Sequence, residues 1–171
     1  MSAHKPLEGV KVVELASFVA APTAGRMMAE MGADVIRVES TAGDPWRFYG
    51  ANCGLPITDE ENPLFDIYNL GKKDIQLNTK TPEGKEILFH LLDEADVFIT
   101  NNRLKSLVRS GLDYESLKDR FPKLIYGLVT GYGQTGPDVD APGYDGVAFF
   151  SRSGMLADMA EPSGYPAGAF L

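Results

Sequence analysis

The sequence has very few of the residues that build disulfide frameworks or metal centres. Only one of its 171 residues, Cys53, is a cysteine, which excludes a disulfide framework and a cysteine-based zinc site. The two histidines, His4 and His90, are too few and too far apart to indicate a bound metal. No apolar run approaches the roughly 20 residues of a membrane span, and the N-terminus lacks the apolar segment of a secretory signal. These absences favour a soluble, cytoplasmic protein.

Positive charge is also scarce. The chain carries 24 acidic and 16 basic side chains, for a net charge of −8. Binding to nucleic acid or to an anionic membrane is therefore not expected, because nothing supplies the positive field that such partners require. The hydrophobic share of 44% is enough to bury the core of one ordinary domain. Composition alone does not name an activity.

Segments rich in β-branched residues alternate with segments typical of helices. The predicted strands cover residues 9–15, 34–39, 74–78, 96–100 and 124–130. The predicted helices begin near Ala20, Pro82, Asp113 and Tyr144. This alternation predicts an α/β, Rossmann-like fold, with an open parallel sheet that carries helices on both faces. In such sheets ligands bind beyond the carboxyl ends of the strands, so the chemistry is expected there.

Two loops stand out. Residues 41–71 lack clear periodicity, and so long a loop is usually functional or covers a site. The segment 131–137 places three glycines directly after the last predicted strand. Such glycines can bring backbone N–H groups close to an anionic or carbonyl ligand, or they can simply form a tight turn. Both interpretations of this segment stay open.

Two familiar kinds of enzyme fit poorly. Glu39 ends the second predicted strand, where a ribose-binding acid of a dinucleotide fold would lie, but the turn at residues 16–22 has no glycine. Glu39 could instead simply face solvent. A serine hydrolase would need a nucleophile elbow that the sequence lacks, and His90 is predicted to be a packed or partly exposed helix residue. Cys53 could act as a nucleophile only beside a base that the sequence does not indicate.

Two arginines lie where they could meet phosphates. Arg47 falls in the long loop and Arg109 near the end of the fourth predicted strand. A guanidinium group suits a phosphate, but a solvated surface charge explains each of them as well.

Several segments, taken in their order and spacing, resemble the class III CoA-transferases, the family that includes formyl-CoA transferase and carnitine CoA-transferase. The matching segments are 6–15, 31–39, 43–47, 69–73, 80–85, 95–97 and 131–137. Further segments resemble the branch of that family which moves CoA between 2-hydroxy acids, such as phenyllactate or 2-hydroxyisocaproate, and their acyl or enoyl partners. These further segments are 16–22, 107–115 and 149–154.

The resemblance implies transfer of CoA from an acyl-CoA to a small carboxylic acid. In the family an aspartate attacks the thioester, forms a mixed anhydride and then carries CoA as an aspartyl-CoA thioester, which splits one acyl exchange into easier steps. Coenzyme A and acyl-CoA are substrates, and no tightly bound cofactor is implied. The alternative is a CoA-binding or acyl-CoA-binding module without chemistry.

The resemblance also implies that residues 1–171 are the N-terminal, Rossmann-like part of a larger CoA-transferase domain. The family's catalytic aspartate would fall just after Leu171, so no residue of this chain is assigned that role and the chain is expected to be inactive alone. The family's small domain and the C-terminal segment that returns to complete the first domain would also be absent. Full-length members form interlocked homodimers.

Seven positions match those that contact CoA in the family, which are Phe18, Val19, Leu77, Lys80, Asn101, Arg109 and Tyr144. The first two lie in the first βα loop, and the next two where the adenine and the 3′-phosphate are contacted. The following two lie near the nucleotide and the diphosphate, and the last lies beside the pantetheine. Two positions depart from the family, since a basic residue and a lysine are replaced by Ser40 and Pro142.

Overall fold

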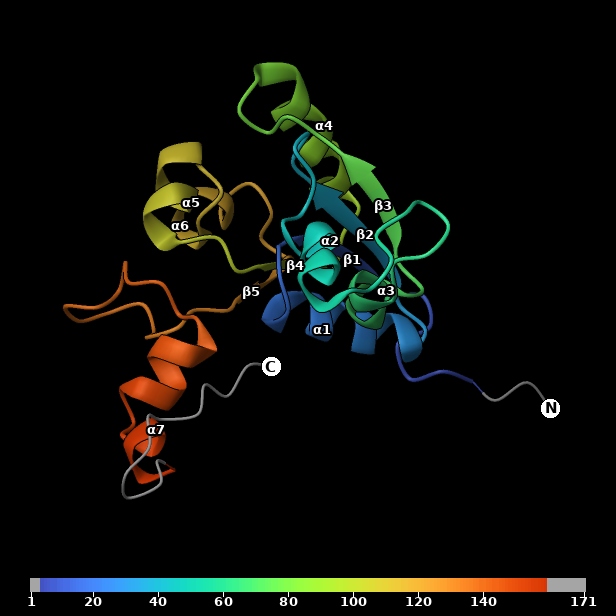
Figure 1. Cartoon of the computed structure of the whole chain (residues 1–171). Coiled ribbons are helices and arrows are strands. Elements are labelled where there is room, and N and C mark those ends of the chain that lie inside the picture. The colour runs from blue at the N-terminus through green and yellow to red at the C-terminus, as the bar shows by residue number, and fades with distance from the viewer. Residues whose placement is uncertain (1–3, 160–171) are drawn as a thin grey trace. The chain divides into compact units, whose positions relative to one another are not determined.

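The computed structural model describes residues 4–159, and its centre is a five-stranded sheet (Figure 1). The strands are β1 (Lys11–Leu15), β2 (Asp34–Glu39), β3 (Lys73–Gln76), β4 (Val97–Thr100) and β5 (Ile125–Leu128). They lie in the order β3-β2-β1-β4-β5, and every neighbouring pair is parallel. All five predicted strands are confirmed, and so is the open parallel sheet. The sequence favours an open loop at residues 161–171, and these lie outside the described residues.

Helices and helical turns connect the strands. They are α1 (Ala20–Glu30), α2 (Trp46–Tyr49), the 3-10 turn η1 (Gly50–Cys53), α3 (Pro63–Asn69), α4 (Pro82–Asp93), α5 (Leu104–Ser110), α6 (Tyr114–Leu117), the π-helical turn η2 (Asp145–Ser151) and α7 (Met155–Asp158). The predicted start of α4 is confirmed, because the Thr81 hydroxyl accepts the N–H of Gly84 at 3.2 Å. The carboxylate of Asp113 caps α6 in the same way, at 3.3 Å from the N–H of Ser116.

The long loop predicted for residues 41–71 is corrected by the structure. This segment contains α2, η1 and α3, each too short to produce a hydrophobic period that a sequence pattern could reveal. Asn62 begins α3 by accepting the N–H of Phe65, and its amide donates to the carbonyl of Arg47 at 2.8 Å. The ring of Trp46 is buried, with its indole N–H donating to the carbonyl of Leu64. The segment is therefore a folded layer that packs along α1.

Helices cover both faces of the sheet, as the alternation of strands and helices predicts. Successive side chains of β1 point to opposite faces, so Val12 packs toward α1 while Val13 packs toward α4. Two separate apolar clusters result. One holds residues of α1 with Val12, Val35 and Ile99, and the other holds Leu88 and Leu92 of α4 with Val13 and Phe98.

The chain divides into two units. The first holds residues 1–102 and 106–129, with the whole sheet, and the second holds residues 103–105 and 130–171. In the second unit a Cβ on Gly131 would lie 2.3 Å from the Cα of Gly143, so the glycines are needed for this loop's own path. Arg152 pairs with Asp138 at 2.9 Å and lies over the ring of Tyr132. Within residues 4–159, every helix is too short or too polar to cross a bilayer.

Candidate functional site

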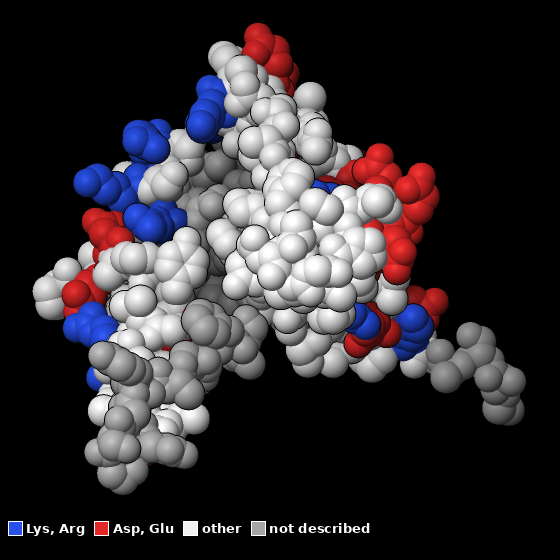
Figure 2. Space-filling model, in the orientation of Figure 1, with Lys and Arg blue, Asp and Glu red and all other residues white. Residues whose placement is uncertain are grey.

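The first unit holds a pocket of about 1070 Å³ at the carboxyl edge of the sheet. Its walls come from the end of β1, from the segment that follows β2, from the β3–α4 connection and from α5 with the residues after it. This is the edge where a parallel sheet places its ligands. On the face of the molecule that Figure 2 shows, lysine and arginine side chains gather beside α4 and around α5. Acidic side chains gather near the loop that leads into α3.

Three cations line the pocket, which are Lys80, Lys85 and Arg109. Lys80 and Arg109 are exposed and Lys85 is half-buried. Within the described residues none of the three forms an ion pair, so their charges are available to an anion that enters the pocket. A guanidinium and two ammonium groups that converge on one space suit the phosphates of a nucleotide.

The same pocket also offers apolar and hydroxyl-bearing side chains. Leu77, Leu107 and Leu112 contribute apolar surface, while Ser106 and Thr79 contribute hydroxyl groups. A site that is mostly apolar, with a few convergent polar groups, is the usual form of a small-molecule pocket.

A buried cluster of charges lies beneath the wall of the pocket that follows β2. Its centre is Arg37, whose side chain is fully buried. The two terminal nitrogens of Arg37 donate to the carboxylates of Glu39 and Asp44, and its Nη1 also lies 3.2 Å from Asp74. The Nε of Arg37 is 3.4 Å from Glu14. Such a set of charges is tolerated in an interior only because every ion is paired.

Arg47 and Lys72 complete this charge cluster. Arg47 donates to the carboxylates of Glu39 and Asp74, each at 2.6 Å, while its guanidinium lies 3.8 Å from the ring centre of Phe65. The ammonium of Lys72 is buried and pairs with Glu14 at 2.8 Å. These cations are fully engaged with the protein's own carboxylates, unlike the three that line the pocket.

Burial and close contact shift the pKa values of this cluster in opposite directions. Burial, followed by the hydrogen bond and the charge of Glu39, raises the pKa of Asp74 to about 7. Burial also acts to raise the pKa of Glu39, but the hydrogen bonds from Arg47 and Asp74 and the charges of the arginines outweigh it and lower that pKa to about 2. The raised pKa of Asp74 favours its protonated form beside an ionised Glu39.

The loop after β1 is tied to this cluster. The carboxylate of Asp44 accepts the backbone N–H of Phe18 with both oxygens, at 3.1 and 3.2 Å, and the N–H of Trp46 at 2.9 Å. From the other side Asn101 accepts the N–H of Ser17 at 3.1 Å and donates to its carbonyl at 2.7 Å. Both hydrogen-bonding groups of the Asn101 side chain are therefore used to hold Ser17.

The structure brings together some of the seven predicted positions. Leu77, Lys80 and Arg109 line the pocket. Phe18 and Val19 follow Ser17, which lines it, and Val19 begins α1 as its N-cap residue. Asn101 holds the same loop through Ser17. Tyr144 belongs to the second unit, where its side chain is 53% exposed.

The structure corrects what the sequence suggested for two charged residues, Glu39 and Arg47. Glu39 is 3% exposed and ion-paired, so the expectation that it faces solvent is wrong, and it also presents no unpaired carboxylate to a ribose. Arg47 pairs with two carboxylates and packs on Phe65, so it is not a simply solvated surface charge, and it does not line the pocket.

Sequence reasoning missed Lys85 and Asp44. Lys85 lies at the fourth position of α4, one helical turn after the Thr81 cap, and that position could have placed it at the carboxyl edge. No sequence signal places Asp44 under Phe18, since the two residues meet only through the fold. The exposed His90 and Cys53 do not line the pocket.

Comparison with known proteins gives consistent matches over nearly the whole chain. A model of CoA-transferase family III matches residues 7–170. The chain is 51% identical over 158 residues to cinnamoyl-CoA:phenyllactate CoA-transferase of Clostridium sporogenes, covering 92% of this chain and 38% of that protein. It is 45% identical over 161 residues to (R)-2-hydroxy-4-methylpentanoate CoA-transferase of Clostridioides difficile, covering 94% and 40%.

Solved structures also match this chain over nearly its whole length. A CAIB/BAIF family protein from Brucella suis superposes with a TM-score of 0.87 at 40% identity, over 98% of this chain and 44% of that chain. The chain therefore spans about two fifths of the length of the curated relatives named above.

Proposed function

We propose that this chain, which belongs to CoA-transferase family III, supplies the CoA-binding pocket of an enzyme that moves CoA from an acyl-CoA to a carboxylic acid. The observation that carries the proposal is a group of three cations, Lys80, Lys85 and Arg109, which form no ion pair within residues 4–159 and line a pocket that also offers apolar side chains. The two relatives named above carry phenyllactate and 2-hydroxy-4-methylpentanoate in their names, so we propose a 2-hydroxy acid as the acceptor.

Coenzyme A suits this pocket in charge and in apolar surface. Its 3′-phosphate and diphosphate need cations, and its adenine needs an apolar surface such as that of Leu77 and Leu112. In this proposal CoA enters and leaves as a substrate, and the complete enzyme is an interlocked homodimer in the cytoplasm.

The carboxylates that line the pocket do not suit the role of nucleophile. Glu39 and Asp44 are buried and hydrogen-bonded to arginines and to backbone N–H groups, so their lone pairs are occupied. A carboxylate that attacks a thioester needs an accessible oxygen aimed at the carbonyl carbon. We therefore assign the nucleophile to no residue that lines this pocket, and we expect this chain alone to transfer no CoA.

Calorimetry with CoA tests the pocket directly. We expect the chain to bind CoA, and Lys80→Met and Arg109→Met each to weaken binding by about tenfold, since each removes one charge-assisted hydrogen bond. Lys123→Met is the matched control. Lys123 is an exposed lysine just before β5, at the amino edge of the sheet, so its loss should leave the affinity unchanged. Absence of heat at millimolar CoA would overturn the pocket assignment.

A transfer assay with radiolabelled acyl-CoA tests the reaction. We expect no transfer by this chain, and transfer to a 2-hydroxy acid by the product of the complete reading frame. Binding of CoA by both proteins with transfer by neither would instead favour a CoA-binding module without chemistry.

A further inference from the structure

The loop between β1 and α1 has a strained backbone beside the pocket. Phe18 has a φ of 62°, and it is the only non-glycine residue with a positive φ among residues 4–159. An aromatic side chain in this left-handed region costs about 1–2 kcal/mol. Such a conformation persists only where the surrounding structure fixes it, and it is characteristic of functional loops.

Asp44 fixes this conformation from one side. Both of its carboxylate oxygens accept the N–H of Phe18, at 3.1 and 3.2 Å. Asp44 is itself held in three ways, because it accepts from Arg37 and from the N–H of Trp46, and its own N–H donates to Glu39 at 2.9 Å. The carboxylate that holds Phe18 is 2% exposed, so it cannot easily exchange this partner for water.

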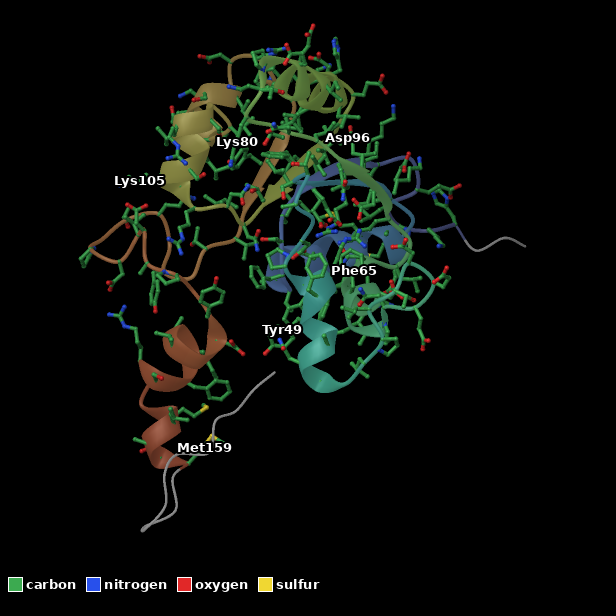
Figure 3. All side chains as sticks on the ribbon, turned by 45° about the horizontal axis from the view of Figure 1, so that its top comes forward. Tyr49, Phe65, Lys80, Asp96, Lys105 and Met159 are labelled. Atoms are coloured by element: carbon green, nitrogen blue, oxygen red, sulfur yellow. The ribbon has the colours of Figure 1, made fainter. Side chains whose placement is uncertain are left out.

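Within residues 4–159, the cation that contacts Asp44 is Arg37, which is already paired with carboxylates. Leu15 to Ser17 and Gly43 to Pro45 both line the pocket, and the arginines near them, Arg37 and Arg47, are committed to carboxylates and lie over the ring of Phe65. Lys80 lies well apart from Phe65, as Figure 3 shows. With the phosphates of CoA on Lys80, Lys85 and Arg109, the pocket wall that is left for the uncharged arm of CoA includes Ala16 and Ser17.

We propose that Asp44 is a positioning residue which, through the N–H of Phe18, holds the β1–α1 loop in the shape that receives the uncharged arm of CoA. Asn101 supports the same shape through Ser17. The inference rests on the proposed function. It adds to that function a residue that lines the pocket and acts through the backbone N–H of Phe18.

Amide hydrogen exchange tests the positioning without any ligand. Asp44→Asn keeps the size of the side chain but removes its charge and places an NH₂ group against donors. We expect the amide of Phe18 to exchange at least about tenfold faster in this variant, since the hydrogen bond that protects it is weakened. The amides of Leu88 and Leu92 in α4 should keep their protection, which shows that the unit stays folded.

Binding of two ligands distinguishes the contribution of the loop from that of the cations. Calorimetry with CoA and with adenosine 3′,5′-bisphosphate should show that Asp44→Asn weakens only CoA, by about fivefold to tenfold, because the bisphosphate lacks the uncharged arm. Lys80→Met should weaken both ligands. Asn101→Ala loosens the same loop without touching the charge cluster, so it should weaken CoA more than the bisphosphate, and it tests the loop even if Asp44→Asn fails to fold.

The outcomes are distinguishable. A parent chain that binds neither ligand would overturn the proposed function, and this inference with it. A parent that binds both, with Asp44→Asn and Asn101→Ala weakening both alike, would overturn the inference alone. Unchanged exchange at Phe18 in a folded Asp44→Asn would also overturn it.

Discussion

The carboxyl groups of Glu39 and Asp74 each lie 2.6 Å from the same guanidinium nitrogen of Arg47. The two acids come from neighbouring strands of the sheet, since Glu39 ends β2 and Asp74 lies in β3. Two carboxyls this close to each other and partly removed from water do not both ionise near neutral pH. Their pKa values of about 2 and about 7 express this coupling.

The first prediction concerns stability and pH. Asp74 keeps its proton in the folded chain up to about pH 7 but loses it near pH 4 when unfolded, so folding stability should fall as pH rises from about 4 to 7. Glu39 has the opposite shift and should cost stability only as pH falls from about 4.5 to 2. Asp74→Asn cannot ionise, so it should remove the share of this loss that comes from Asp74, while Glu14, whose pKa is also raised by burial, keeps its own share. Thermal unfolding at pH 5 and pH 8 measures this.

Asp34→Asn is the control for that experiment, because Asp34 is an exposed acid of the same sheet, paired with Lys73. It should keep the pH dependence of the parent. A parental slope in Asp74→Asn would show that the proton is held elsewhere.

The second prediction concerns the buried pair of Lys72 and Glu14. Lys72→Met leaves the fully buried carboxylate of Glu14 without its ammonium partner, so we expect a loss of about 3–5 kcal/mol in the free energy of unfolding. Lys73→Met removes the adjacent lysine, whose pair with Asp34 is exposed, and should cost less than about 1 kcal/mol. Urea denaturation of both variants measures the difference, and equal losses would contradict the role given to burial.

The third prediction concerns Gly25 in α1. A Cβ at this position would lie 1.9 Å from Oε2 of Glu14, so α1 can approach the sheet only with a glycine there. Gly25→Ala should destabilise the chain although alanine favours a helix by about 1 kcal/mol. Gly146→Ala is the matched control, because its Cβ would meet nothing within 4 Å. A Gly25→Ala variant that is as stable as the parent in thermal unfolding would refute this close approach.

The fourth prediction concerns Lys85, which the pattern of the sequence did not single out. Lys85→Met should weaken CoA binding by about tenfold at low salt, because one of the three cations in the pocket is lost. Added salt should weaken the parent's binding more than that of the variant, since salt screens the charges that remain. Calorimetry at two salt concentrations measures this, and an affinity equal to that of the parent would remove Lys85 from the site.

Much of the fold follows from local pattern. β2 has the predicted bounds, and α4 and α6 begin where predicted, with Thr81 and Asp113 as their caps. Where prediction failed, the elements were short. α2, α3 and α5 have four to seven residues each, and such lengths give no measurable hydrophobic period.

The site was only partly predictable, for a different reason. Lys80 and Arg109 were found from the resemblance and lie in the pocket. Glu39 and Arg47 could each have faced solvent according to the sequence, but the structure pairs them with each other. The sequence shows that a residue is charged, but it does not show whether the side chain faces a ligand, the solvent or another charge. Which of these applies depends on the partner that the fold brings to it.

The sequence by itself determined the order of strands and helices, the parallel sheet and the family, because these depend on local periodicity and on motifs that are continuous in the chain. Only the tertiary structure decided which cations stay unpaired. Arg37 and Arg47 meet carboxylates 2 to 37 residues away along the chain, whereas Lys80, Lys85 and Arg109 converge on one pocket. The free energy of an ion depends on what lies within a few ångströms of it, and that neighbourhood exists only after folding.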